Sequence, residues 1–278
     1  MSLFGWVCTI VIFIIIVLIT VANKYNQTFS KEKQELLTAT GRAQALEHLL
    51  MLFGEGCDKK ASSALKSIQR VYKGSVKPAF VFTNPCGQFE QILDAVRDML
   101  SMVLSFEGGH CIEKNDIYAS LAFKLNFDDQ EWQFADVNKQ RGANIAELLQ
   151  EQSKSTLKYL IDSNDPYIFF NSKEEARELG RYLPDAEDRK LLNKLTGSIA
   201  CYKINAKRGD VNYVSAVLCF STYDKRFADE QDIETTKYNM LNFIVAQFEK
   251  RIRVELLNYC MYKLYEGKQA ASEQSDKL

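Results

Sequence analysis

The segment NYVSAVLCFS (residues 212–221) leads through a short loop to RFADEQD (residues 226–232), after which a long helical pattern begins. The first segment is nearly continuous in small and apolar residues, which is typical of a central strand covered on both faces. Phe227 can fill the core beneath the end of this strand, while Asp229 and Glu230 suit the positively polarised N-terminus of a helix. The two segments therefore predict a buried strand that leads directly into a helix.

Shorter apolar runs upstream have the length and composition of further strands. SIACYKI (residues 198–204) is joined to the central strand by a turn, and IYASLAFKL (117–125) and EWQFADV (131–137) flank an acidic turn that predicts a hairpin. A fourth short run covers residues 167–170. Because neighbouring segments are joined by turns, we expect an antiparallel sheet in a protein of the α+β class.

Helical spacing of apolar residues marks three other stretches. These are residues 88–106, residues 147–161, and residues 233–265, the last of which contains neither proline nor glycine. At about 1.5 Å per residue the last helix is about 50 Å long, so we expect it to extend beyond its domain. Residues 172–194 are charged and irregular.

This order of elements resembles that of the GAF domain family. The resemblance covers about residues 84–255 and is most specific in the last strand and in the segment Arg226-Phe227-Ala228-Asp229-Glu230, which is similar to an Arg-Phe-Thr-Asp-Glu-like segment of GAF domains. It implies a five- or six-stranded antiparallel sheet with long flanking helices on one face. PAS and related sensor sheets share much of this architecture and remain an alternative.

The resemblance also implies a small-molecule pocket on the other face, beneath an irregular cover at residues 163–194. Arg181 is the one candidate suited to an anionic ligand, because its guanidinium presents a planar fork of donors. The alternative interpretation is that the aromatic residues form ordinary core and that the pocket is small or closed. The candidate ligand-binding residues are Trp132, Phe169, Phe170, Arg181 and Tyr182.

The N-terminus carries an uncharged apolar run from residue 3 to residue 22. Twenty residues at about 1.5 Å each match the roughly 30 Å hydrocarbon core of a membrane, so the run predicts a transmembrane helix that contacts lipid. A cleaved signal peptide is the alternative. Lys24, Lys31, Lys33 and Arg42 follow the run and none precedes it, which predicts a single-pass membrane protein with its N-terminus outside and its C-terminal domain cytoplasmic.

Two stretches show the three- and four-residue steps of helices that pair along an apolar seam. The sequence predicts either a homodimer or packing of these helices on their own domain. The first stretch contains Leu36, Ala39, Ala43, Leu46, Leu50 and Phe53, and the second contains Phe248 and Ile252.

The predicted organisation has five parts. Residues 1–23 form the anchor, residues 24–56 a juxtamembrane amphipathic helix, and residues 57–84 a connector with a short helix. Residues 85–266 form the GAF-like domain with its long terminal helix, and residues 267–278 a disordered tail. Because no output domain follows, we expect a separate effector protein.

The composition and the motifs argue against nucleic-acid binding, metal binding and catalysis. The formal net charge is −1 and charges of both signs are interspersed, so we expect no nucleic-acid partner. There are only two histidines, and no metal, nucleotide or hydrolase motif is present, so we predict no metal, no cofactor and no enzyme. Three of the seven cysteines, Cys111, Cys201 and Cys219, are the candidates for a thiol-based reaction.

The leading functional hypothesis is a membrane-tethered sensory or interaction module. A small molecule or a partner would bind the GAF-like domain, and the helical seams would transmit the change to the effector. Two alternatives remain: a redox enzyme or sensor that uses pocket cysteines, and a structural tether without a ligand.

Overall fold

The structure is a computed structural model. It describes residues 50–56, 85–107, 112–126, 131–135, 144–185, 188–189 and 195–275, together with scattered positions between 24 and 48. The chain divides into two compact units, Met1–Glu47 and His48–Leu278. All the elements named below belong to the second unit.

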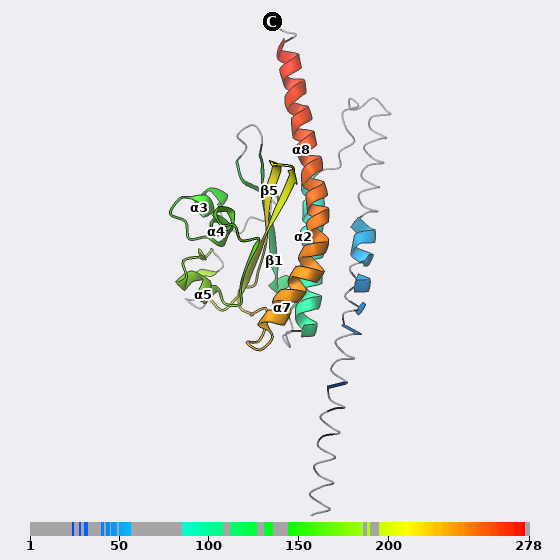
Figure 1. The fold of residues 1–278 in the computed structure, drawn as a ribbon, viewed down its shortest axis with the longest axis vertical. Coiled ribbons are helices and arrows are strands. Elements are labelled where there is room, and N and C mark those ends of the chain that lie inside the picture. The colour runs from blue at the N-terminus through cyan, green and yellow to red at the C-terminus, as the bar shows by residue number, and fades with distance from the viewer. Residues whose placement is uncertain are drawn as a thin grey trace, which may run out of the picture. The chain divides into compact units, whose positions relative to one another are not determined.

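The second unit is built on one five-stranded sheet, in which every neighbouring pair is antiparallel (Figure 1). The strand order is β2-β1-β5-β4-β3, so β5 lies in the middle, as its small and apolar residues predict. The β4–β5 turn contains Gly209 at a φ of 60°, a left-handed conformation that glycine adopts without strain. The strands are β1 (Tyr118–Leu125), β2 (Gln133–Phe134), β3 (Tyr167–Phe170), β4 (Ile199–Arg208) and β5 (Val211–Ser221).

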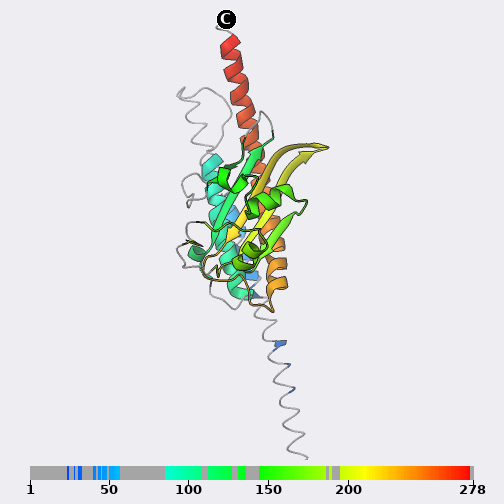
Figure 2. The same ribbon diagram turned by 90° about the vertical axis from the view of Figure 1, so that its left-hand side faces the viewer.

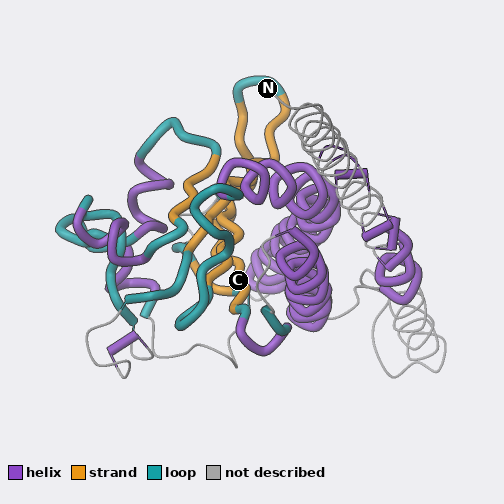
Figure 3. Tube along the Cα trace, turned by 90° about the horizontal axis from the view of Figure 1, so that it is seen from below, coloured by secondary structure: helices purple, strands orange, loops and turns teal. Residues whose placement is uncertain are grey.

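One face of the sheet is covered by long helices, and we call it the helix face (Figure 3). The predicted helix at residues 88–106 is α2 (Pro85–Glu107). The predicted terminal helix begins at Ile233 as expected, but it consists of α7 (Ile233–Asn239), a π-helical segment (Met240–Val245) and α8 (Ala246–Ser275). The end of α8 continues past the strands (Figure 1).

The helix face encloses a core of apolar side chains. Phe89 of α2 stacks on Phe123 of β1 with 5.7 Å between ring centroids, and Phe220 of β5 and Phe248 of α8 are almost completely buried. The steps of three and four residues in α2 bring Ile92, Val96 and other apolar residues onto one side, which explains why this helix lies on the sheet.

The opposite face, which we call the cover face, carries three short helices (Figure 2). They are α3 (Ile145–Leu149), α4 (Thr156–Asp162) and α5 (Lys173–Glu178). The single helix predicted at residues 147–161 is thus divided, because Ser155 caps α4 by accepting a hydrogen bond from the Lys158 amide at 3.0 Å. A short 3-10 helix, η1 (Lys114–Asp116), precedes β1.

The prediction of a membrane anchor is corrected. Within the part of the chain that the structure describes, no helix combines the length and the apolar character needed to cross a membrane. The long helices α2 and α8 carry charged residues such as Asp94, Arg97 and Lys250, whose transfer into hydrocarbon is costly. The transmembrane fold class and the single-pass localisation are therefore withdrawn. Residues 3–22, which carried that prediction, lie outside the described residues.

Two other predicted segments are the connector and the C-terminal tail. The connector at residues 57–84 lies outside the described residues. The helix α8 extends to Ser275, so residues 267–275, predicted to be a disordered tail, are helical in the structure.

Candidate functional site

The five predicted ligand-binding residues do not form a single wall. Phe170 and Tyr182 are buried in the apolar cluster of the cover face, and Trp132 packs against the same cluster. These three side chains therefore contribute to the core beneath α3, α4 and α5, as the alternative interpretation of the sequence expected.

The other two predicted residues lie elsewhere. Phe169 points to the helix face, because it alternates with Phe170 along β3, and its ring lies 5.8 Å from that of Phe227. The Arg181 guanidinium carbon lies 4.2 Å from the centre of the Tyr159 ring, a cation–π contact at the surface of the cover.

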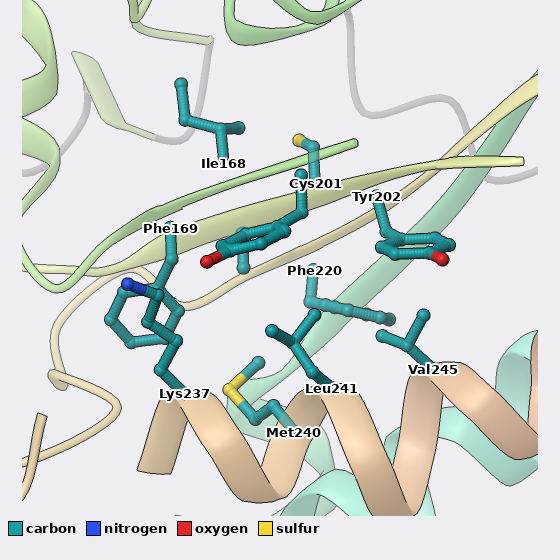
Figure 4. Close-up of a pocket in the computed structure, with 11 residues that line it drawn as sticks. Ile168, Phe169, Cys201, Tyr202, Phe220, Lys237, Met240, Leu241 and Val245 are labelled. Carbon is teal, nitrogen blue, oxygen red and sulfur yellow. The ribbon is translucent and has the colours of Figure 1, made fainter. Parts of the chain in front are cut away.

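A different hollow lies on the helix face, between the β3 edge of the sheet and the π-helical segment (Figure 4). We call it the slot. Its cavity measures about 10 Å³, which admits about one water molecule, and its lining is mostly apolar. The residues that line it are Tyr167, Ile168, Phe169, Ala200, Cys201, Tyr202, Phe220, Lys237, Met240, Leu241 and Val245.

The two walls of the slot differ in their backbone structure. One wall is the sheet, whose strands are hydrogen-bonded on both sides at β4 and β5. The other wall includes Met240, Leu241 and Val245 of the π-helical segment. Helical turns of this kind are rare and occur frequently at functional sites. The slot is therefore bounded by a regular sheet and an irregular helix.

Polar groups occur at two places around the slot. The Lys237 ammonium lies 5.6 Å from the centre of the Tyr167 ring and 3.5 Å from a Glu234 carboxylate oxygen. The Tyr202 hydroxyl donates a hydrogen bond to Glu249 at 3.2 Å, and burial together with this carboxylate raises the pKa of Tyr202. The slot thus combines apolar walls with one cation and a neutral phenol.

The sequence predicted parts of the slot in other roles. Phe169 belonged to the predicted pocket, whereas Leu241 and Val245 lie within the helix predicted at residues 233–265. No residue pattern marks the π-helical turn, which places Leu241 against the sheet (Figure 4).

A buried charge cluster lies on the cover side, where the sequence predicted only an irregular stretch. The Lys173 side chain is fully buried, and its ammonium lies 2.9 Å from Asp188 and 3.9 Å from the centre of the Tyr223 ring. The Asp188 carboxylate also accepts hydrogen bonds from the Tyr182 hydroxyl and from the Asp185 amide at 3.1 Å. We call these five residues the lysine cage.

The lysine cage joins segments that are distant in the sequence. Lys173 begins α5, and its backbone amide donates to the Gly197 carbonyl at 2.8 Å. The Tyr223 hydroxyl donates to Asp185, which connects the cover to the loop after β5. Burial lowers the pKa of Lys173 despite the opposing effect of Asp188. Because every member contacts another member, the cage is best explained as a structural connection.

The predicted helical seams have different environments in the structure. Leu36 and Ala39 lie outside the described residues, and Ala43 is exposed. Leu46 and Leu50 are exposed as well, with 50% and 64% of their surface accessible.

The remaining seam residues pack within the chain. Phe53 lies 5.5 Å from Phe248 between ring centroids, and both Phe248 and Ile252 are fully buried. Another stripe on α8 is exposed at steps of three, four and three residues: Val254, Leu257, Met261 and Leu264.

The structure brings two of the three candidate thiols together. Cys201 and Cys219 are directly opposed on β4 and β5, whereas Cys111 lies outside the described residues. In the described part of the chain, no group of three or more histidine, cysteine, aspartate or glutamate residues is arranged to hold a metal ion.

No protein-family model matches the chain, and no curated protein or solved structure shows significant similarity to it. The GAF-like assignment therefore stays a prediction.

Proposed function

We propose that the described domain is a non-catalytic sensory or interaction module that responds to a small amphipathic ligand in the slot. The observation that carries this proposal is the position of the slot between the sheet and the π-helical segment that leads into α8. The apolar walls favour an apolar ligand body, and the Lys237 ammonium favours an anionic group at its end.

The slot is too small to bind a ligand without a change of structure. A cavity of about 10 Å³ cannot hold an organic ligand, so binding requires displacement of one wall. The π-helical wall is the one expected to move, because a shift of the central strands would break hydrogen bonds on two sides. Ligand binding would then select a conformation in which α7 or α8 has moved.

The π-helical segment continues into α8, and this continuous helix can transmit a displacement caused by ligand binding. Val245 lines the slot, and Phe248 and Ile252 follow it on the buried side of the same helix. A displacement at Val245 must therefore alter the packing of α8 on α2 and the sheet, because protein cores are closely packed. The extension of α8 beyond the strands makes this helix the natural contact for an effector (Figure 1).

The GAF-like resemblance supports a sensory function only at the level of architecture. The five antiparallel strands and the long terminal helix agree with what the resemblance implies. The hollow lies on the helix face, however, and not beneath the cover where the resemblance placed the ligand.

Self-association through α8 belongs to the same proposal. The exposed stripe formed by Val254, Leu257, Met261 and Leu264 has the spacing of a coiled-coil seam over two heptads. A second copy offers the same stripe, so the two surfaces can complement each other about a two-fold axis.

The test uses the full-length protein and the fluorescent probe 8-anilinonaphthalene-1-sulfonate, which has an apolar aromatic body and one anionic group. We expect bound probe to slow hydrogen exchange at residues 233–252, as measured by mass spectrometry. Lys237→Ala should weaken probe binding by about twofold to fivefold, because one ionic contact to a partly exposed ammonium is lost.

The matched control is Lys250→Ala, which removes an exposed lysine of α8 that does not line the slot. This variant should bind the probe as the wild type does. If the probe leaves exchange at residues 233–252 unchanged, or if both variants bind it equally, the slot is not the ligand site.

A further inference from the structure

A pair of thiols lies at the centre of the sheet. Cys201 of β4 and Cys219 of β5 are directly opposed partners in the antiparallel register. Directly opposed residues of such strands have Cα atoms about 4.5–5.5 Å apart. This separation falls within the range of about 4.4–6.8 Å that disulfides span. The backbone therefore places the two cysteines at a distance that a disulfide can bridge.

Both side chains also belong to the same face. Cys201 is part of the buried cluster of the cover face, and Cys219 packs against that cluster. Figure 4 shows the Cys201 sulfur on the opposite side of the strands from Met240 and Leu241, so it points away from the interior of the slot. The two thiols are thus neighbours on the cover face.

The two thiols differ in exposure. Cys201 is 2% accessible, while Cys219 is only partly buried. Burial raises the pKa of the Cys201 thiol, and a hydrogen bond with Cys219 adds to this effect. A small oxidant therefore reaches Cys219 more readily than Cys201.

We propose that Cys201 and Cys219 form a peroxide-sensitive dithiol that converts reversibly to a cross-strand disulfide. The Cys219 thiol first attacks hydrogen peroxide, which gives a Cys219 sulfenic acid and one water. The Cys201 sulfur then attacks the sulfenic sulfur, and the hydroxyl leaves as a second water when the S–S bond forms. The two thiols lose two electrons and two protons, and the peroxide is reduced to two waters.

Cys201 is among the residues that line the slot, but both cysteine side chains belong to the opposite face of the sheet. The disulfide would link the two central strands on the cover face, whereas the proposed ligand displaces a helix on the helix face. Oxidation of the thiol pair therefore does not require that the slot binds a ligand.

Peptide mapping of the full-length protein tests the proposal. The protein is treated with hydrogen peroxide, the remaining thiols are blocked with N-ethylmaleimide, and the unreduced protein is unfolded and digested with trypsin. We expect one linked species that joins residues 195–203 to residues 209–225, two hydrogen masses lighter than the sum of the peptides. Dithiothreitol should restore both free peptides.

Two variants separate the roles of the cysteines. With Cys201→Ser, Cys219 should accumulate as a sulfenic acid that dimedone traps, because the resolving thiol is missing. With Cys260→Ser, the linked species should form as in the wild type, since Cys260 belongs to α8 and not to the two strands that carry the pair. Wild-type Cys219 should lose its free thiol roughly tenfold faster than the buried Cys260.

The proposal fails if peroxide leaves both peptides unlinked while the protein stays folded. It also fails if Cys219 links to a different cysteine, or if Cys219 and Cys260 react at equal rates. Should Cys201→Ser not fold, the wild-type linkage map and the rate comparison still decide the question.

Discussion

Replacement of Asp188 by asparagine should strongly destabilise the domain. The Lys173 ammonium is fully buried, 2.9 Å from the Asp188 carboxylate, and the substitution removes the charge that compensates it. Loss of one partner from a buried ion pair costs about 3–5 kcal/mol, because the other charge stays buried. In a domain of this size each kcal/mol lowers the melting temperature by about 2–4 °C. We therefore expect a loss of roughly 6–20 °C.

The loss should also depend on pH. Burial already lowers the pKa of Lys173, and Asp188 opposes this effect, so its removal lowers that pKa further. Above this lowered pKa, Lys173 is neutral in the folded variant, whereas in the unfolded chain it stays protonated up to a pKa of about 10.4. Between these two pKa values the unfolded state binds one more proton than the folded state does. The free energy of unfolding of Asp188→Asn should therefore rise with pH in this window, by up to about 1.4 kcal/mol per pH unit.

The assay is urea unfolding of the full-length protein followed by tryptophan fluorescence, since Trp132 packs against the core of the cover face. Wild type and Asp188→Asn are compared between pH 6 and pH 9. The double variant Lys173→Met with Asp188→Asn removes both charges and should recover roughly 1–3 kcal/mol of the loss. A loss below about 1 kcal/mol, with no steeper pH dependence than the wild type, would refute the buried ion pair.

Three further predictions concern other parts of the domain. Gly197→Ala should lower the free energy of unfolding, measured by urea unfolding, by about 1–3 kcal/mol, because the added Cβ would lie 1.9 Å from the Thr222 carbonyl oxygen. The control is Gly54→Ala, whose added Cβ has no atom within 4 Å and which should not destabilise the protein. The hydrogen bond from Lys225 lowers the pKa of Asp116, so this contact stabilises the fold above the unfolded pKa of about 3.9 and its contribution is lost as the pH falls through the folded pKa. Asp116→Asn should therefore reduce the free energy of unfolding at pH 7 by less than about 1 kcal/mol. It should also make the melting temperature fall less steeply at acid pH than that of the wild type. The proposed self-association through the exposed α8 stripe predicts that full-length protein sediments as a dimer in analytical ultracentrifugation and that Leu257→Glu sediments as a monomer. A monomeric wild type, or a variant that stays dimeric, would exclude this stripe as an interface.

The sequence predicted the elements of the domain well, because their signals are local. The continuous apolar run of β5 identified a central strand, and the helical spacing of α2 identified the helix that packs beside it. The hairpin of β1 and β2 was likewise confirmed. The thiols Cys201 and Cys219 were named as candidates, although nothing in their spacing showed that they face each other.

The candidate ligand site was not predictable in this way. The resemblance placed a pocket beneath the cover, but Phe170 and Tyr182 fill that space, and the slot lies on the other face. The π-helical turn that forms one wall depends on how Met240–Val245 packs against the sheet, and no local residue pattern specifies it.

The sequence by itself thus determined the α+β class, the strands and the two long helices, because alternation and helical spacing report which side of each element avoids water. Only the tertiary structure decided which helical stripe is buried and which is exposed. Phe248 and Ile252 are covered by the rest of the chain, whereas Leu257 and Met261 of the same helix are not. The physical reason is that burial is set by partners far away in sequence. The same long-range packing joined Lys173 to Asp188 and set Cys201 opposite Cys219.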